Sequence, residues 1–203
     1  MKGNVYTVFY AAALGSACAL LLTAAASFTA PYKKANAEAE EALNILLALK
    51  APVDAEASAA EVLKVLGQTV QQKTRGNVAM YTYCPPDAGG KILAVAVRFS
   101  GPGLWGPVKG FLALEPDFKT IRGITFYEQE ETPGLGGEIA ASWFREQFVG
   151  KSIVAPDGKP GIIISKPGEQ AVNKVDAISG ATMTCDKVQA MLNEAIKSIV
   201  EEK

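Results

Sequence analysis

A hydroxyl group on a tight turn before a helix is the feature of this sequence best suited to chemistry. The turn spans residues 176–182 (DAISGAT), and apolar residues recur at helical spacing over 188–200. We expect this helix to begin near Thr184 to Asp186, with one of these two residues as its cap. Unpaired amide N–H groups and the helix dipole favour an anion at such an N-terminus. A phosphate group would fit there, and Thr182 is the predicted attachment point.

Two glycine-rich loops also carry residue types that suit ligand binding. The first, Gly101–Gly106, has the pair Leu104-Trp105 at its tip, and this tryptophan either packs at the edge of the core or contacts a ligand. The second, Glu131–Glu138 (ETPGLGGE), has glycines that let backbone amides face a ligand closely. Its glycine spacing differs from that of a dinucleotide fingerprint, and no phosphate-loop lysine follows.

The elements that must position these residues indicate an α+β domain. Strand patterns occur in four adjacent segments, at 77–83, 91–99, 107–114 and 120–128. Because turns join these segments directly, we expect a mainly antiparallel sheet. Helices over 137–148 and from Thr184 onward would cover one face of the sheet, and 162–165 would add a short strand.

An uncharged apolar segment, Val5–Ala30, lies near the N-terminus and is long enough to cross a membrane, which takes roughly 20 residues. A cleaved signal peptide is the alternative, because Ala35-Asn36-Ala37 resembles a cleavage site, but the apolar run is about twice as long as a usual signal core. Lipidation at Cys18 is a second alternative, although this residue lies in the middle of the segment. We interpret the segment as an uncleaved transmembrane helix. The lysines flanking it do not decide its orientation.

The predicted organisation has four parts. They are a short N-terminus (1–4), the transmembrane helix (5–30), a helical linker region (31–75) and a folded domain (76–203). Within the linker region, a helical pattern over 36–50 stops before Pro52, and a second short helix over 58–66 ends at Gly67.

Composition excludes several classes of function. The net charge is −1 and the basic residues are scattered, so nothing favours nucleic-acid binding. The chain has no histidine, which removes histidine-ligated haem, the usual imidazole zinc sites and a histidine general base. We therefore predict neither a metal site nor a catalytic residue of the common triad type.

The turn resembles a flavinylation motif in which FMN is joined by a phosphoester bond to the final threonine. The motif reads Asp-x-x-Ser-Gly-Ala-Thr, and every specified position is present. The resemblance implies that a periplasmic flavin transferase attaches FMN to Thr182. Asp176 and Ser179 would be read by the transferase or shape the turn, beside the small residues Gly180 and Ala181.

The order of motifs along the chain resembles that in the C subunit of the sodium-translocating NADH:quinone reductase. The motifs are Gly-Leu-Trp, the segment Gly110–Leu114, the segment Glu131–Glu138 and Ser-Gly-Ala-Thr. The G subunit of the related Rnf complex, a ferredoxin:NAD⁺ oxidoreductase, is similar. The Leu-Trp loop and the Gly-Gly-Glu ending favour the former family, whereas the compact length and short linker favour the latter.

In both families this subunit is a single-span membrane protein that carries covalent FMN. The resemblance implies that six residues line or approach the isoalloxazine ring, namely Glu131, Thr132, Leu135 and Gly136, with Leu104 and Trp105 nearby. It also implies an inner-membrane location, with residues 1–4 in the cytoplasm and the FMN domain on the periplasmic side. The chain would relay electrons between other integral membrane subunits rather than turn over a substrate.

The absence of other redox motifs from the sequence also supports the dependence of this chain on partner subunits. A flavin must receive and deliver electrons, yet the sequence has no nicotinamide fingerprint, no cysteine cluster for iron and sulfur and no haem-binding Cys-x-x-Cys-His. A different class of function stays open, that of a non-catalytic, membrane-tethered periplasmic interaction module. Cys84 and Cys185 either form a disulfide or remain independent buried thiols.

Overall fold

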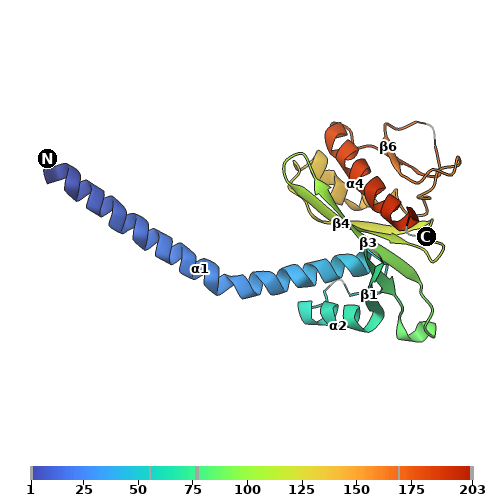
Figure 1. Ribbon diagram of the computed structural model, residues 1–203, viewed down its shortest axis with the longest axis horizontal. Coiled ribbons are helices and arrows are strands. Elements are labelled where there is room, and N and C mark those ends of the chain that lie inside the picture. Colours follow the sequence, from blue (N-terminus) through green and yellow to red (C-terminus); the bar gives the residue numbers. More distant parts are fainter. Residues whose placement is uncertain (1, 55, 76–77, 169, 202–203) are drawn as a thin grey trace. The chain divides into compact units, whose positions relative to one another are not determined.

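The computed structural model describes residues 2–54, 56–75, 78–168 and 170–201. The chain divides into two units, Met1–Ala39 and Glu40–Lys203. Helix α1 (Lys2–Ala48) passes through the first unit and ends in the second (Figure 1). The separate helix expected over 36–50 is therefore the end of α1, which continues through Pro31. Proline removes one backbone donor, but the rest of the segment keeps its helical pattern.

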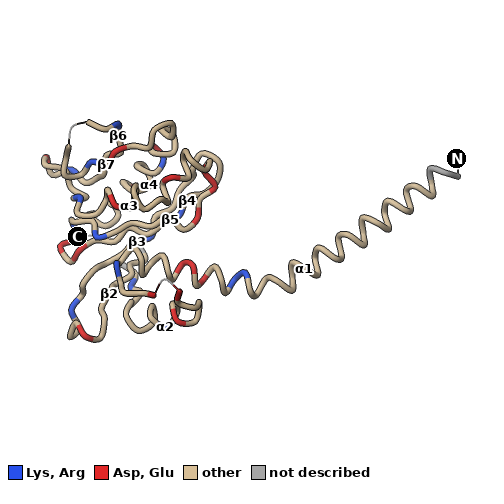
Figure 2. Tube along the Cα trace, turned by 180° about the vertical axis from the view of Figure 1, so that it is seen from behind, with Lys and Arg blue, Asp and Glu red and all other residues tan. Residues whose placement is uncertain are grey.

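The first unit is apolar and exposed. From Val5 onward, α1 is long and apolar enough to cross a membrane, with a mean hydropathy of 1.9 in its most apolar window and none of that window buried. Figure 2 shows no charged residue in this helix from Val5 up to Lys33. An exposed run of this kind is stable in lipid rather than in water, as the predicted transmembrane helix requires.

The second unit contains an antiparallel sheet of five strands in the order β1-β2-β3-β4-β5. The strands are β1 (Val70–Arg75), β2 (Val78–Tyr83), β3 (Ala94–Pro102), β4 (Pro107–Leu114) and β5 (Ile121–Glu128). The expected α+β class and antiparallel sheet are confirmed. Residue 77, the start of the first predicted strand, which corresponds to β2, lies outside the described residues. Strand β1 was not predicted; it occupies part of the region expected to be a helical linker.

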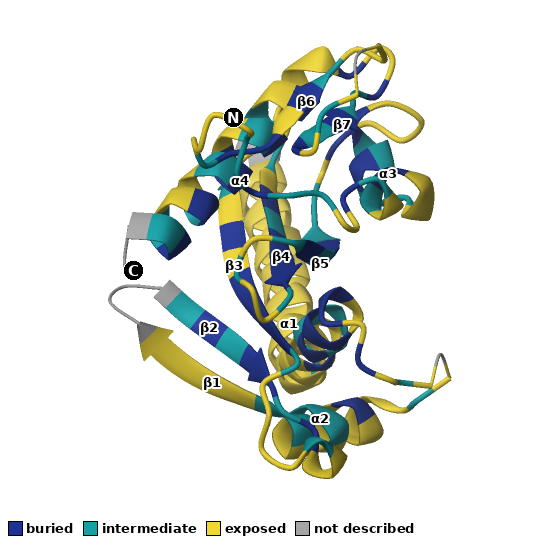
Figure 3. Cartoon of the chain, turned by 90° about the vertical axis from the view of Figure 1, so that its right-hand side faces the viewer, coloured by how far each residue is buried: buried dark blue, intermediate teal, exposed yellow. Residues whose placement is uncertain are grey.

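Helices cover both faces of this sheet, whereas one covered face was predicted. On one face, α4 (Thr182–Glu201) and α3 (Ser142–Glu146) pack over apolar side chains such as Val97 and Leu112. On the other face, the end of α1 and helix α2 (Ala59–Thr69) pack over side chains such as Ala96 and Phe111. Figure 3 shows buried residues on both sides of the central strands. The two helices of the predicted linker are thus part of the domain core.

Several element boundaries differ from the predictions. Helix α2 continues through Gly67, because the amide N–H of Val70 closes its last turn on the carbonyl of Leu66. The helix expected over 137–148 is split into a 3₁₀ segment, η2 (Gly136–Ala140), and the short α3. The short strand predicted over 162–165 is present as β6 (Ile163–Ser165). It pairs in parallel with β7 (Lys174–Asp176), a strand that was not predicted.

The three cysteines of the chain are free. Cys18 is exposed, Cys84 is half-buried and Cys185 is buried. Of the two alternatives for Cys84 and Cys185, the structure thus has independent thiols, of which Cys185 is the buried one.

Candidate functional site

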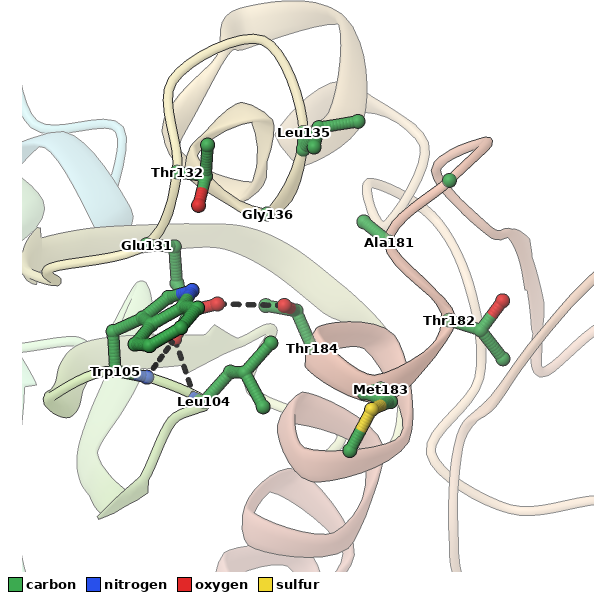
Figure 4. A pocket seen from close by; sticks show the side chains of 11 residues that line it. Leu104, Trp105, Glu131, Thr132, Leu135, Gly136, Ala181, Thr182, Met183 and Thr184 are labelled. Carbon is green, nitrogen blue, oxygen red and sulfur yellow. Dashed lines mark hydrogen bonds between the residues drawn. The ribbon is translucent and has the colours of Figure 1, made fainter.

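Three segments that lie far apart in the sequence meet at one pocket of about 230 Å³. They are the loop between β3 and β4, the loop after β5, and the first turn of α4 (Figure 4). The lining residues are Leu104, Trp105, Glu131, Thr132, Leu135, Gly136, Gly180, Ala181, Thr182, Met183 and Thr184. Both glycine-rich loops and the threonine turn, which the sequence singled out separately, therefore contribute to the same pocket.

The carboxylate of Glu131 joins these three segments. One oxygen, Oε1, accepts hydrogen bonds from the backbone N–H groups of Leu104 at 2.6 Å and Trp105 at 3.3 Å. The other oxygen, Oε2, accepts a hydrogen bond from the hydroxyl of Thr184 at 2.6 Å. Glu131 is only 5% exposed. Because a buried carboxylate is costly unless it is hydrogen-bonded, these three donors explain why it is tolerated here.

Two glycines make room for this carboxylate. A Cβ atom on Gly103 would lie 2.4 Å from Glu131 Oε1, and one on Gly136 would lie 2.7 Å from Glu131 Oε2 and 2.6 Å from Thr184 Oγ1. Contacts this short would force the hydrogen-bonded groups apart. The glycines at these two positions are therefore required by the close approach of neighbouring groups rather than by a positive φ.

The N-terminus of α4 presents Thr182 to solvent. Thr182 is the first helical residue and is exposed. Gly180 precedes it with a φ of +78°, a conformation that glycine adopts readily. The amide N–H of Ala181 donates to the carbonyl of Ile178 at 3.1 Å, and the first helical bond runs from Cys185 to Ala181 at 3.0 Å. Within the described part of the chain, the amide N–H groups of residues 182–184 have no hydrogen-bond acceptor.

The predicted cap of this helix was wrong. The helix begins at Thr182 rather than between Thr184 and Asp186, so both residues lie inside its first turns. Thr184 is 2% exposed and gives its hydroxyl to Glu131. The side chain of Asp186 is exposed. A threonine one turn from the start of a helix looks like a cap in sequence, but here a long-range partner takes its hydroxyl.

Two residues of the predicted motif do not line the pocket. Asp176 is the last residue of β7, and its amide N–H donates to the side-chain oxygen of Gln147 at 3.0 Å. Ser179 is exposed in the turn that follows. Cys185 stabilises the same turn, because its sulfur accepts a hydrogen bond from the amide N–H of Ile178 at 3.4 Å. Burial raises the pKa of the Cys185 thiol.

Apolar side chains form the rim of the pocket. Trp105 is 70% exposed, Met183 60%, Leu135 44% and Leu104 40%. Exposed apolar groups gathered at a pocket mark a binding surface. Met183 was not predicted as a site residue, although its place directly after Thr182 was a usable signal. In Figure 4, Thr182 lies at the opposite end of the pocket from Trp105, with its hydroxyl pointing away from the Glu131–Thr184 pair.

Comparison with known proteins gives a consistent result. Residues 103–197 match the FMN-binding domain. The chain is 36% identical over 153 residues to the C subunit of Na(+)-translocating NADH-quinone reductase from Pasteurella multocida, covering 75% of this chain and 56% of that protein. It is 40% identical over 131 residues to the same protein from Neisseria meningitidis serogroup B, covering 60% of this chain and 51% of that protein.

Solved structures agree. The crystal structure of the C subunit from Parabacteroides distasonis superposes with a TM-score of 0.71 and 26% identity, covering 84% of this chain and 94% of that one. The crystal structure of Shewanella oneidensis NqrC gives a TM-score of 0.67 at 24% identity, covering 78% and 91%. The chain is thus similar in sequence and in fold to C subunits of Na(+)-translocating NADH-quinone reductases. It spans about half the length of the curated relatives it matches.

The match to an FMN-binding domain indicates FMN as the cofactor, and the residues at the pocket suit it. All lining residues, from Leu104 to Thr184, fall inside the matched FMN-binding region. A flat apolar ring suits the exposed rim around Trp105. A phosphate group suits the first turn of α4, where amide N–H groups and the positive end of the helix dipole are directed to solvent.

Proposed function

We propose that this chain is the electron-carrying subunit of a membrane-bound, sodium-translocating NADH:quinone reductase, and that it holds FMN through a phosphoester bond to Thr182. A flavin transferase on the periplasmic side forms this bond. The chain is anchored in the inner membrane by its first helix, residues 1–4 lie in the cytoplasm, and the FMN domain lies in the periplasm.

The observation that carries this proposal is the position of Thr182 relative to the other residues of the pocket. FMN has a phosphate at one end and an isoalloxazine ring at the other. The exposed hydroxyl of Thr182 and the free amides of α4 lie at one end of the pocket, and Leu104 and Trp105 lie at the other (Figure 4). An esterified phosphate on Thr182 would let the flavin extend across the pocket toward the apolar rim.

The other hydroxyl in this turn of α4 is less suited to attachment. Thr184 is buried, and its hydroxyl donates to Glu131 at 2.6 Å. A transferase could reach it only after this hydrogen bond is broken and the turn is opened. Thr182 needs neither change, because it is exposed and precedes the first helical hydrogen bond. Accessibility in the structure and the sequence motif therefore both support Thr182, rather than Thr184, as the attachment residue.

Covalent attachment fits a carrier that works outside the cytoplasm, since a lost flavin could not be replaced there. The residues of the pocket bind and orient the ring, while the redox chemistry is supplied by FMN when it is bound. The electron donor and acceptor are on partner subunits, which are integral membrane proteins of the same complex. The G subunit of an Rnf-type ferredoxin:NAD⁺ oxidoreductase is the second candidate, favoured by the compact length of the chain.

The test uses the full chain produced with the flavin transferase. Wild-type protein should be fluorescent on a denaturing gel, and its intact mass should include one esterified FMN. Thr182→Ala should lose both signals completely, because the phosphoester bond needs the Thr182 hydroxyl, and Ser179, the other exposed hydroxyl of this turn, does not line the pocket. Thr184→Val is the matched control and should still carry FMN. Attachment of FMN to the Thr182→Ala protein would contradict the proposal.

The same preparations separate the carrier from a non-catalytic tether. A carrier is yellow and bleaches on reduction, whereas a simple interaction module would be colourless in the presence of the transferase. Gentle detergent extraction from the native membrane should recover the chain together with several integral membrane subunits. Purification of the chain alone, with unchanged quinone and NAD reduction after its deletion, would contradict the assignment to a complex.

A further inference from the structure

We infer that the Glu131 carboxylate sets the reduction potential of the bound flavin, by placing a negative charge that no cation compensates in the wall of its pocket. This inference rests on the proposed function, because it requires FMN in the pocket. It concerns a positioning and electrostatic role of Glu131, which acts together with the hydroxyl of Thr184.

Glu131 is shielded from water, and no Lys or Arg among the described residues forms an ion pair with it. The side chain is 5% exposed, so solvent and salt screen it weakly. Among the described residues, the ion pairs of the domain involve other acidic groups, such as Glu128 with Lys109 and Glu115 with Arg122. Glu131 is held instead by neutral donors, which are two backbone amides and one hydroxyl.

The arrangement predicts opposite effects for two substitutions. Reduction adds negative charge to the flavin, and a fixed negative charge nearby opposes it. Removing the charge from Glu131 should therefore raise the midpoint potential. The hydroxyl of Thr184 directs its positive end at the carboxylate and partly offsets the charge. Removing that hydroxyl should lower the potential.

Two nearly isosteric variants test these signs. In Glu131→Gln the amide oxygen can still accept from the amides of Leu104 and Trp105, and the amide nitrogen can donate to Thr184, so the shape is kept and the charge is lost. In Thr184→Val the charge is kept and one hydrogen bond is lost. Glu130→Gln is the matched control, because it removes the same charge from the neighbouring, exposed side chain.

The measurement is a dithionite titration of the full FMN-loaded chain in detergent, with reference dyes and visible spectra. Glu131→Gln should shift the one-electron equilibrium toward reduction at least tenfold, which corresponds to about 59 mV. Thr184→Val should shift it the opposite way by a smaller factor. Glu130→Gln should shift it less than Glu131→Gln does, because water screens its charge.

The signs distinguish a charge effect from loosening of the pocket. A structural role alone would move both pocket variants in the same direction, toward the potential of free FMN, and this result would overturn the inference. An unchanged potential in Glu131→Gln would also overturn it. If Glu131→Gln does not fold, the sign in Thr184→Val decides, since a rise there contradicts the inference.

The proposed function can fail separately. If the mass of the wild-type chain includes no FMN, the proposal of covalent attachment is wrong before any potential is measured. If the wild-type chain and the variants carry FMN but share one potential, attachment stands and the role of Glu131 is refuted.

Discussion

Helices α2 and α4 start in opposite ways. The N-terminus of α2 is closed by its own side chains: the Ser58 hydroxyl accepts from the amide N–H of Glu61 at 3.4 Å, and the Glu61 carboxylate accepts from the amide N–H of Ser58 at 2.8 Å. The N-terminus of α4 follows Ala181, which has no side-chain acceptor. Its first residue, Thr182, leaves both its amide and its hydroxyl open to solvent.

The difference shows how the two ends serve different purposes. A side-chain cap typically stabilises a helix by about 1 kcal/mol. Helix α2 has this contribution and belongs to the scaffold of the domain. Helix α4 lacks it at the one place where, under the proposed function, a phosphate would supply the acceptor oxygens. An uncapped helix start beside a pocket is thus a functional signal in this protein.

Substituting one glycine in each region should give effects of opposite sign. Gly180→Ala forces a side chain into a φ of +78°, with its Cβ 3.1 Å from Leu135, and should lower the free energy of unfolding by about 1–2 kcal/mol. Gly67→Ala lies inside α2 with open space around it and should raise stability by up to about 1 kcal/mol. Urea denaturation of the two variants measures both changes. A neutral or stabilising effect of Gly180→Ala would show that the turn before α4 imposes no special conformation.

Adding a side-chain cap at the N-terminus of α4 should weaken the interaction of its amide N–H groups with phosphate. Ala181→Ser places a hydroxyl where Ser58 lies in α2, and it would compete for the amide N–H groups of the first turn. Because such a cap is worth about 1 kcal/mol, we expect flavin attachment to slow about fivefold. The rate is measured by gel fluorescence at timed intervals after addition of the transferase. An unchanged rate would mean that these amides do not assist attachment.

The capped end of α2 should respond to acid. Hydrogen bonds from the hydroxyl and then the backbone N–H of Ser58 lower the pKa of Glu61 below its ordinary value of 4.5. A depressed pKa in the folded state gives stability above pH 4.5 that is lost as the pH falls through the folded-state pKa. The stability difference between wild type and Ser58→Ala should therefore shrink on acidification. A stability difference that stays constant from neutral pH to about pH 3, a range that includes the titration of carboxyl groups, would contradict this prediction.

The central strands and the pocket segments were predictable because their signals are local. Alternating apolar residues and turn residues define β3, β4 and β5 within a few positions. The glycine-rich loops and the threonine turn are each visible as short motifs. Local patterns gave the segments of the pocket, and resemblance to a family gave the reason to bring them together.

Other features depend on contacts that no local pattern contains. Strand β1 reads Val-Gln-Gln-Lys-Thr-Arg and lies at the edge of the sheet, so it lacks the apolar alternation that marks a strand. Strand β7 has only three residues. The hydroxyl of Thr184 was read as a cap because its partner, Glu131, is 53 residues away. With its hydroxyl bonded to Glu131, Thr184 does not cap the helix, which starts at Thr182.

The central claim is that Thr182, at the uncapped start of α4, carries the flavin. Trypsin cleaves after Lys174 and Lys187, so one peptide, residues 175–187, contains Ser179, Thr182 and Thr184. Fragmentation of this peptide in a mass spectrometer, from wild-type chain made with the transferase, locates the FMN on a single residue. We predict fragments that place the whole FMN mass on Thr182. FMN on Ser179 or Thr184, or a peptide of unmodified mass, would contradict the account.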